Sequence, residues 1–148
     1  MYRKLFLLSV LLLALLLVAC GGESANAPVV DQVSVNQAPA VDVSALPDTV
    51  DVHTVASIKD QDDVYVIDVR EQWEYDEGHI PGVTLIPMNE VPDRLEEIPT
   101  DKDVIVTCRS GNRSGQITEY LRQIGYDNVH NMSGGIIAWE AEGYQVDR

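Results

Sequence analysis

The stretch "VIVTCRSGNRSGQITEYLRQIG" at residues 104–125 places one thiol, Cys108, between an apolar run and an amphipathic one. The run at 104–107 is short, continuous and β-branched, as in a strand that is covered on both faces of a parallel sheet. Apolar residues recur at helical spacing over 114–124, and Gly125 then follows as a typical helix stop. We therefore predict a strand, a tight loop that holds Cys108, and a helix.

Other segments repeat this alternation of strands and helices. Residues 64–68 ("VYVID") form a second continuous apolar run, 128–132 a weaker one, and 49–52 and 83–87 two marginal ones. Helical segments are predicted between these runs. Such alternation indicates an α/β domain with a central parallel sheet flanked by helices. We place this domain at residues 46–148, which is a usual domain size.

Residues 1–19 have the pattern of a signal peptide. A short basic start precedes fifteen residues, 5–19, that are apolar except for Ser9. This run is shorter than the about 20 residues that a membrane-spanning helix needs, and it has the length of a signal-peptide core. The end of the run, "LVAC", resembles the lipobox of bacterial lipoproteins, which implies cleavage before Cys20 and a diacylglycerol on its thiol. An ordinary signal peptide with a chance cysteine is the alternative.

Residues 20–45 are predicted to link this lipid to the folded domain. After Cys20 the segment has no aromatic residue and no Lys or Arg, and its valines follow no sustained period. Such a composition is typical of a flexible tether. The leader therefore predicts an exported protein, held by its lipid on a membrane of the bacterial cell envelope, with the domain outside the cytoplasm.

The charge of the chain excludes some partners. Ten Lys and Arg residues stand against 24 Asp and Glu residues, for a net charge of −14. This argues against nucleic acid, whose binding needs a basic surface, and against attachment to an anionic membrane by charge. No cluster of metal ligands and no nucleotide-binding motif is visible, so we predict neither a metal nor a cofactor. The sequence does not set the oligomeric state, for which we expect a monomer.

Cys108 is the cysteine for which the sequence suggests chemistry. The chain has two cysteines, and if Cys20 carries lipid then Cys108 has no disulfide partner. A single free thiol in an exported protein points to a reactive role, because oxidising compartments tend to pair structural cysteines. The predicted position of Cys108, just past the carboxyl end of a central strand, is where open α/β sheets bind ligands.

The loop after Cys108 has the composition of a site that holds a negative sulfur. Its small residues let the backbone curl, so that successive N–H groups point inward as an anion-binding nest. The N-terminus of the following helix adds partial positive charge, and two arginines add full charges. We therefore expect a lowered pKa for the Cys108 thiol. The loop consists of Arg109, Ser110, Gly111, Asn112, Arg113 and Ser114.

This loop, "CRSGNRS", resembles the active-site loop of the rhodaneses, a family of sulfurtransferases. Residues 64–82, "VYVIDVREQWEYDEGHIPG", resemble the family's Asp-Val-Arg strand, acidic helix and Gly-His-Ile-Pro-Gly turn. Residues 132–140, "MSGGIIAWE", resemble its late Gly-Gly and Ala-Trp segment. The resemblance runs from about residue 46 to residue 146 in the expected order. Val83 departs from the family's usual Ala, and we expect only a local packing effect.

The resemblance implies that Cys108 is catalytic. It would take a sulfane sulfur from a small anionic donor such as thiosulfate, hold it as a persulfide, and pass it to cyanide or a thiol. Asp68 and Arg70 would support the site through internal hydrogen bonds. For Arg109 and Arg113, binding of the donor's sulfonate and bracing of the loop remain open alternatives.

Two rival functions stay open. The first is a persulfide carrier or sensor that binds sulfur without turnover. The second is a small phosphatase-like or arsenate-reducing enzyme, because those enzymes also have a Cys-to-Arg loop at a helix N-terminus. They place one residue more between Cys and Arg, whereas here four residues separate Cys108 from Arg113 and the next position is Ser114. The shorter loop makes a smaller ring of N–H donors, which suits the terminal sulfur of a persulfide.

Structural roles are predicted for the remaining residues of these motifs. His79 lies in a predicted turn, and a persulfide mechanism needs no general base. Trp139 is expected in the core. Gly134 and Gly135 are expected to allow a close approach of the backbone near the site.

Overall fold

The computed structural model describes residues 41–148. The predicted signal peptide at 1–19, the lipidation site Cys20 and the tether as far as residue 40 lie outside the described residues, and they stay predictions. Within the described part of the chain, no helix is long and apolar enough to cross a membrane.

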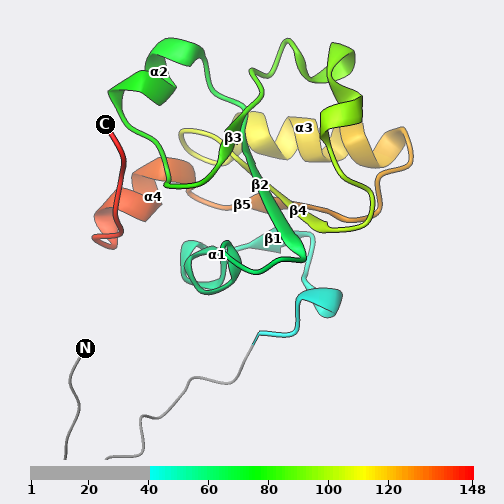
Figure 1. The fold of residues 1–148 in the computed structure, drawn as a ribbon, viewed down its shortest axis with the longest axis horizontal. Coiled ribbons are helices and arrows are strands. Elements are labelled where there is room, and N and C mark those ends of the chain that lie inside the picture. The colour runs from blue at the N-terminus through cyan, green and yellow to red at the C-terminus, as the bar shows by residue number, and fades with distance from the viewer. Residues whose placement is uncertain (1–40) are drawn as a thin grey trace, which may run out of the picture. The chain divides into compact units, whose positions relative to one another are not determined.

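A five-stranded sheet, in the order β1-β5-β4-β2-β3, forms the centre of the domain (Figure 1). Every neighbouring pair of strands is parallel, and β4 is the middle strand. This arrangement confirms the predicted α/β fold with a central parallel sheet. The strands are β1 (Thr49–Val50), β2 (Val64–Asp68), β3 (Thr84–Leu85), β4 (Asp103–Thr107) and β5 (Val129–Met132).

Helices cover both faces of the sheet. Figure 1 shows α3 on one side of the sheet and α1 on the other, with α4 on the side of α1. The α-helices are α1 (Val52–Ile58), α2 (Gln72–Glu77), α3 (Asn112–Gln123) and α4 (Gly135–Ala141). Three short 3₁₀ helices are η1 (Val43–Ala45), η2 (Val91–Asp93) and η3 (Leu95–Glu97).

The core consists of two apolar clusters, one on each face of the sheet. On β2, Val66 belongs to the cluster under α1 and α4, whereas its neighbour Ile67 belongs to the cluster under α3. On β4, Ile105 and Val106 divide in the same way. Successive residues of these strands are therefore buried on opposite faces, which explains why both runs are continuously apolar. Trp139 of α4 is buried in the first cluster, as predicted.

Several element boundaries differ from the prediction. The strand expected at 49–52 ends at Val50 because Asp51 caps α1, with its carboxylate accepting a hydrogen bond from the Thr54 N–H at 2.7 Å. The strand expected at 83–87 is limited to Thr84–Leu85, the residues that pair with β2. The chain also packs earlier than residue 46, since Val41 and Val43 contact the first cluster. Their side chains are apolar enough to pack although they follow no period.

Candidate active site

Cys108 follows the last residue of β4, and the next helix, α3, begins at Asn112. The predicted order of strand, loop and helix is therefore confirmed. Because β4 is the middle strand, Cys108 lies at the carboxyl end of the centre of the sheet, where α/β folds bind ligands. Its side chain is only 1 % exposed, and it is the one free cysteine within residues 41–148.

The loop curls around the Cys108 sulfur. The Gly111 N–H donates a hydrogen bond to Sγ at 3.1 Å, and the Ser114 hydroxyl lies 3.3 Å from the same sulfur. Gly111 adopts φ of +92°, a left-handed conformation that favours glycine. A Cβ at this position would also meet the Gly134 nitrogen at 3.1 Å. The tight turn that aims the N–H at the sulfur therefore depends on a glycine here.

These hydrogen bonds favour the charged form of the sulfur. Burial raises the pKa of the Cys108 thiol, but donors from the loop and from α3 outweigh it, so that the pKa lies below its ordinary value. The donors are the Ser114 hydroxyl and the N–H groups of Ser114, Ser110 and Gly111. The direction agrees with the prediction, and hydrogen bonds are the largest cause of the lowering. A thiolate is the nucleophilic form of cysteine, so the loop favours the more reactive form of Cys108.

Arg113 braces the loop against α2. Its guanidinium donates two hydrogen bonds to the Glu74 carboxylate, at 2.6 and 2.7 Å. Hydrogen bonding to Arg113 lowers the pKa of Glu74 from 4.5 to about 2, and the same contact raises the pKa of Arg113. Such a bidentate pair fixes both side chains and neutralises most of the arginine's charge. Of the two roles left open for Arg113, this contact favours the bracing role.

Arg109 differs from Arg113 in its surroundings. Within residues 41–148 its guanidinium has no hydrogen-bond or ion-pair partner. It lines a pocket of about 280 Å³ together with Arg70, Trp73 and Ile137. Trp73 and Ile137 are 62 % and 44 % exposed, although both are large apolar residues. Arg109 therefore keeps its donors available for an anion that approaches the loop.

Asp68 and Arg70 form a buried pair at the end of β2. The Asp68 carboxylate accepts hydrogen bonds from the Arg70 backbone N–H at 3.0 Å and from its Nε at 2.8 Å. The same guanidinium donates to the carbonyl oxygens of Glu74 and Gly78, at 3.1 and 2.9 Å. All three nitrogens of the guanidinium take part in these contacts, which tie α2 to the sheet. This is the supporting role predicted for the two residues.

The N-terminus of α4 packs directly under the loop. The Ile136 N–H donates to the Cys108 carbonyl at 2.9 Å, and the Ile137 N–H donates to the Arg109 carbonyl at 3.1 Å. A Cβ on Gly135 would lie only 2.3 Å from the Cys108 carbonyl oxygen, where no side chain fits. The close approach predicted for the Gly134–Gly135 pair therefore occurs at the Cys108 loop itself.

The other predicted loop residues are at the surface. Ser110 and Asn112 are exposed, and the Asn112 carbonyl accepts a hydrogen bond from Gln116 at 3.3 Å. His79 lies away from the sulfur network; its ring stacks on Tyr75 and its Nδ1 contacts the Tyr75 carbonyl at 3.0 Å. Among the described residues no group of His, Cys, Asp and Glu side chains could hold a metal ion.

Two residues of the site were missed in the sequence. Glu74 holds Arg113, and Asn131 of β5 accepts a hydrogen bond from the Ser114 hydroxyl at 2.6 Å. Glu74 had a local signal, because it lies three residues after the helix N-cap Glu71 as in a capping box. Asn131 had a weaker one: its neighbour Val129 is buried on the same side of the strand, so an amide is unusual there.

Comparison with known proteins identifies the family to which this chain is similar. The model of the family described as "Rhodanese-like domain" matches residues 51–142. A sulfurtransferase of Allochromatium vinosum is 45 % identical over 89 residues, which cover 60 % of this chain and 83 % of that protein. The thiosulfate sulfurtransferase GlpE of Pseudoalteromonas translucida is 34 % identical over 82 residues, covering 55 % of this chain and 78 % of the relative.

Solved structures agree with the fold. The crystal structure of a rhodanese-related protein from Thermoplasma volcanium superposes with a TM-score of 0.62 at 32 % sequence identity. The match covers 68 % of this chain and 98 % of that one. The part of the chain that carries the sheet and the Cys108 loop therefore corresponds to nearly all of that protein.

Proposed function

This chain belongs to the family of rhodanese-like domains, and we propose that it is a sulfurtransferase that works through a persulfide on Cys108. The observation that supports this most is the ring of donors around one sulfur: Gly111 N–H at 3.1 Å and the Ser114 hydroxyl at 3.3 Å. Such donors stabilise a charged sulfur without any proton transfer, which is what both halves of a sulfur-transfer reaction require.

In the first half, the Cys108 thiolate attacks the outer sulfur of a donor such as thiosulfate. A new S–S bond forms as the S–S bond of the donor breaks, and sulfite leaves with the bonding electron pair. The charge of the thiolate passes to the outer sulfur of the persulfide, and sulfite keeps the two charges of thiosulfate. The persulfide is thus a covalent intermediate that divides the transfer into two displacements.

In the second half, cyanide or a thiolate attacks the outer sulfur of the persulfide. The bond between the two sulfurs breaks, the acceptor leaves with the outer sulfur, and the electron pair returns to Cys108 as a thiolate. The lowered pKa of Cys108 helps this step as well, because a stabilised thiolate is a better leaving group.

Arg109 is proposed to bind the sulfonate end of the donor. Its guanidinium has no partner among the described residues, whereas Arg113 is held by Glu74. A guanidinium can donate two parallel hydrogen bonds to a sulfonate oxygen pair and offset its charge. This contact would orient the donor so that its outer sulfur faces Cys108.

Turnover of thiosulfate and cyanide tests this function and its rivals. We expect thiocyanate production by the full chain and none by Cys108→Ser, which is nearly isosteric but lacks the sulfur. A chain that takes up one sulfur and shows no turnover with cyanide or thiols is a carrier or sensor instead. Hydrolysis of an aryl phosphate or reduction of arsenate would favour the phosphatase-like alternative.

We also propose that the protein is lipid-anchored at Cys20, with its domain outside the cytoplasm. The support is the basic start, the apolar run and the "LVAC" end of the leader. Stable attachment by acyl chains generally needs more than one chain, as a lipidated cysteine provides. Cys20→Ala should release the domain from the membrane fraction. If that variant stays on the membrane with an intact N-terminus, the leader is an uncleaved anchor and the proposal is wrong.

A further inference from the structure

The Ser114 hydroxyl has two acceptors within reach and only one proton. Its oxygen lies 3.3 Å from Cys108 Sγ and 2.6 Å from the carbonyl oxygen of the Asn131 side chain. A hydroxyl donates a single hydrogen bond. The shorter contact has the length of a strong O–H···O bond, so the proton points to Asn131 while the sulfur is a neutral thiol. A thiolate on Cys108 would compete with Asn131 for that same proton.

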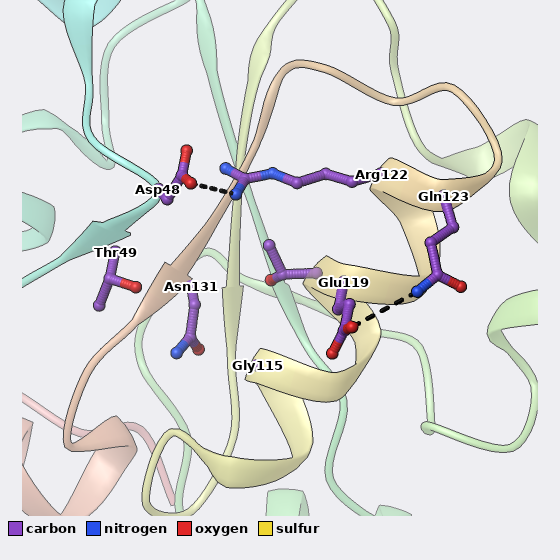
Figure 2. A pocket seen from close by; sticks show the side chains of 8 residues that line it. Asp48, Thr49, Gly115, Glu119, Arg122, Gln123 and Asn131 are labelled. Atoms are coloured by element: carbon purple, nitrogen blue, oxygen red, sulfur yellow. Dashed lines mark hydrogen bonds and ion pairs between the residues drawn. The ribbon is translucent and has the colours of Figure 1, made fainter.

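The surroundings of Asn131 allow its amide to turn and release the Ser114 proton. It lies on β5 facing α3, and Figure 2 shows it opposite Gly115 on the wall of an open pocket of about 570 Å³. The amide nitrogen of Asn131 is 3.4 Å from the point that a Cβ on Gly115 would occupy. Within residues 41–148 this nitrogen has no hydrogen-bond partner. A half-turn of the amide therefore breaks no bond other than the one to Ser114.

We propose that Asn131 is a positioning residue whose amide directs the Ser114 proton either to itself or to the sulfur of Cys108. With a neutral thiol, the S–H of Cys108 donates a hydrogen bond to the Ser114 oxygen, and the Ser114 hydroxyl donates one to the Asn131 carbonyl. With a thiolate the amide is turned, so that its N–H₂ group donates to Ser114 and the Ser114 hydroxyl donates to sulfur. The chain of hydrogen bonds thus reverses its direction when the sulfur ionises.

This reversal fits the two halves of the proposed reaction, on which the inference rests. The attacking sulfur and the departing sulfur are both thiolates and need the Ser114 proton. In the persulfide the charge lies on the outer sulfur, beside the N–H groups of the loop, and the inner sulfur is neutral. The Ser114 proton then returns to Asn131, which avoids leaving the hydroxyl without an acceptor at a position that is fully buried.

The charged groups that the structure already holds near Cys108 stay the same when Asn131 is replaced, and Asn131→Leu adds no new charge. Those nearest the sulfur are Arg113 of α3 with its partner Glu74 of α2, and the Asp68–Arg70 pair at the end of β2. Arg109 of the loop follows Cys108 in sequence, and its side chain is exposed. On the side of Asn131, the pocket is lined by Asp48, Arg122 and Glu119, of which the first two form an ion pair at 2.9 Å.

The test is a titration of the thiolate by its ultraviolet absorption in the full chain. The Cys20→Ser replacement makes Cys108 the sole thiol in every sample. Asn131→Asp presents only acceptors, holds the Ser114 proton, and should raise the midpoint by about one pH unit. Asn131→Leu leaves sulfur as the only acceptor of the hydroxyl, and its midpoint should lie at or below that of the unaltered site.

The same replacement in a Ser114→Ala background separates the proton from the charge of the new carboxylate. Without the hydroxyl, Asn131→Asp acts through space alone, and its shift should be at most half of that seen with Ser114 present. Equal shifts in the two backgrounds, or a rise in Asn131→Leu, would overturn the inference. The titration needs no sulfur donor, so failed turnover would contradict the proposed function and leave this result standing.

Discussion

Replacing Glu74 by glutamine removes the charge that holds Arg113 and keeps the shape of the side chain. The drop in the Glu74 pKa from 4.5 to about 2 corresponds to about 3 kcal/mol, at about 1.4 kcal/mol for each pH unit. Water screens the pair on the Arg113 side, whose side chain is 31 % exposed, while that of Glu74 is 9 % exposed. We therefore expect Glu74→Gln to lower the free energy of unfolding by about 2 kcal/mol at neutral pH.

The pH dependence of this loss identifies its cause. Because the folded state lowers the Glu74 pKa, the unfolded chain binds the proton more readily, and stability falls as the pH falls. The contribution is complete above about 4.5 and disappears as the pH falls toward about 2. The difference between the unaltered chain and Glu74→Gln should narrow over that range.

Urea unfolding at several pH values measures both effects. Glu97→Gln is a matched control, since Glu97 also forms a short bidentate pair, with Arg94 at 2.6 and 2.7 Å, but at the exposed surface. It should change stability little, because exposed ion pairs contribute little. A Glu74→Gln loss that is the same at acid and neutral pH, or no larger than that of the control, would refute a brace that acts through charge.

Three further predictions concern the loop. Gly135→Ala should unfold the loop and abolish activity, because its Cβ would meet Cys108 and Arg109 backbone atoms at 2.3 to 2.6 Å. Gly143→Ala is the control: its φ is +76° but the space around it is open, so it should lower the free energy of unfolding, measured by melting, by only about 1 kcal/mol. Arg109→Ala should raise KM for thiosulfate about tenfold with an unchanged melting temperature, whereas Arg113→Ala should lower the melting temperature. The lowered pKa of Cys108 predicts that the rate of persulfide formation rises with pH and levels off below the pH at which an ordinary cysteine ionises.

The central strands were predictable because burial on both faces of the sheet requires a continuous run of apolar residues. β2 has the predicted bounds, Val64–Asp68, and β4 differs from its prediction by one residue. The edge strands are too short to show such a run. β1 and β3 are two residues each, and their extent is set by pairing with β5 and β2 rather than by their own residues.

The candidate site was predictable where it is local in sequence. The small residues between Cys108 and α3 indicated a curled loop with inward N–H groups, and the contact from Gly111 confirms this geometry. The contacts that complete the site are distant in sequence. Arg113 and Glu74 are 39 residues apart, and Ser114 and Asn131 are 17 apart. No period or motif within one segment carries such pairings, which exist only once the fold brings α2, α3 and β5 together.

The most direct test is the mass of the Cys108 peptide after incubation of the full chain with thiosulfate. The account predicts a gain equal to one sulfur atom on this peptide, and loss of that sulfur when cyanide or a thiol is added. The same peptide in Cys108→Ser should gain nothing. A chain whose Cys108 peptide stays unmodified by thiosulfate, or which forms thiocyanate equally well with serine at position 108, would contradict sulfur transfer through this residue.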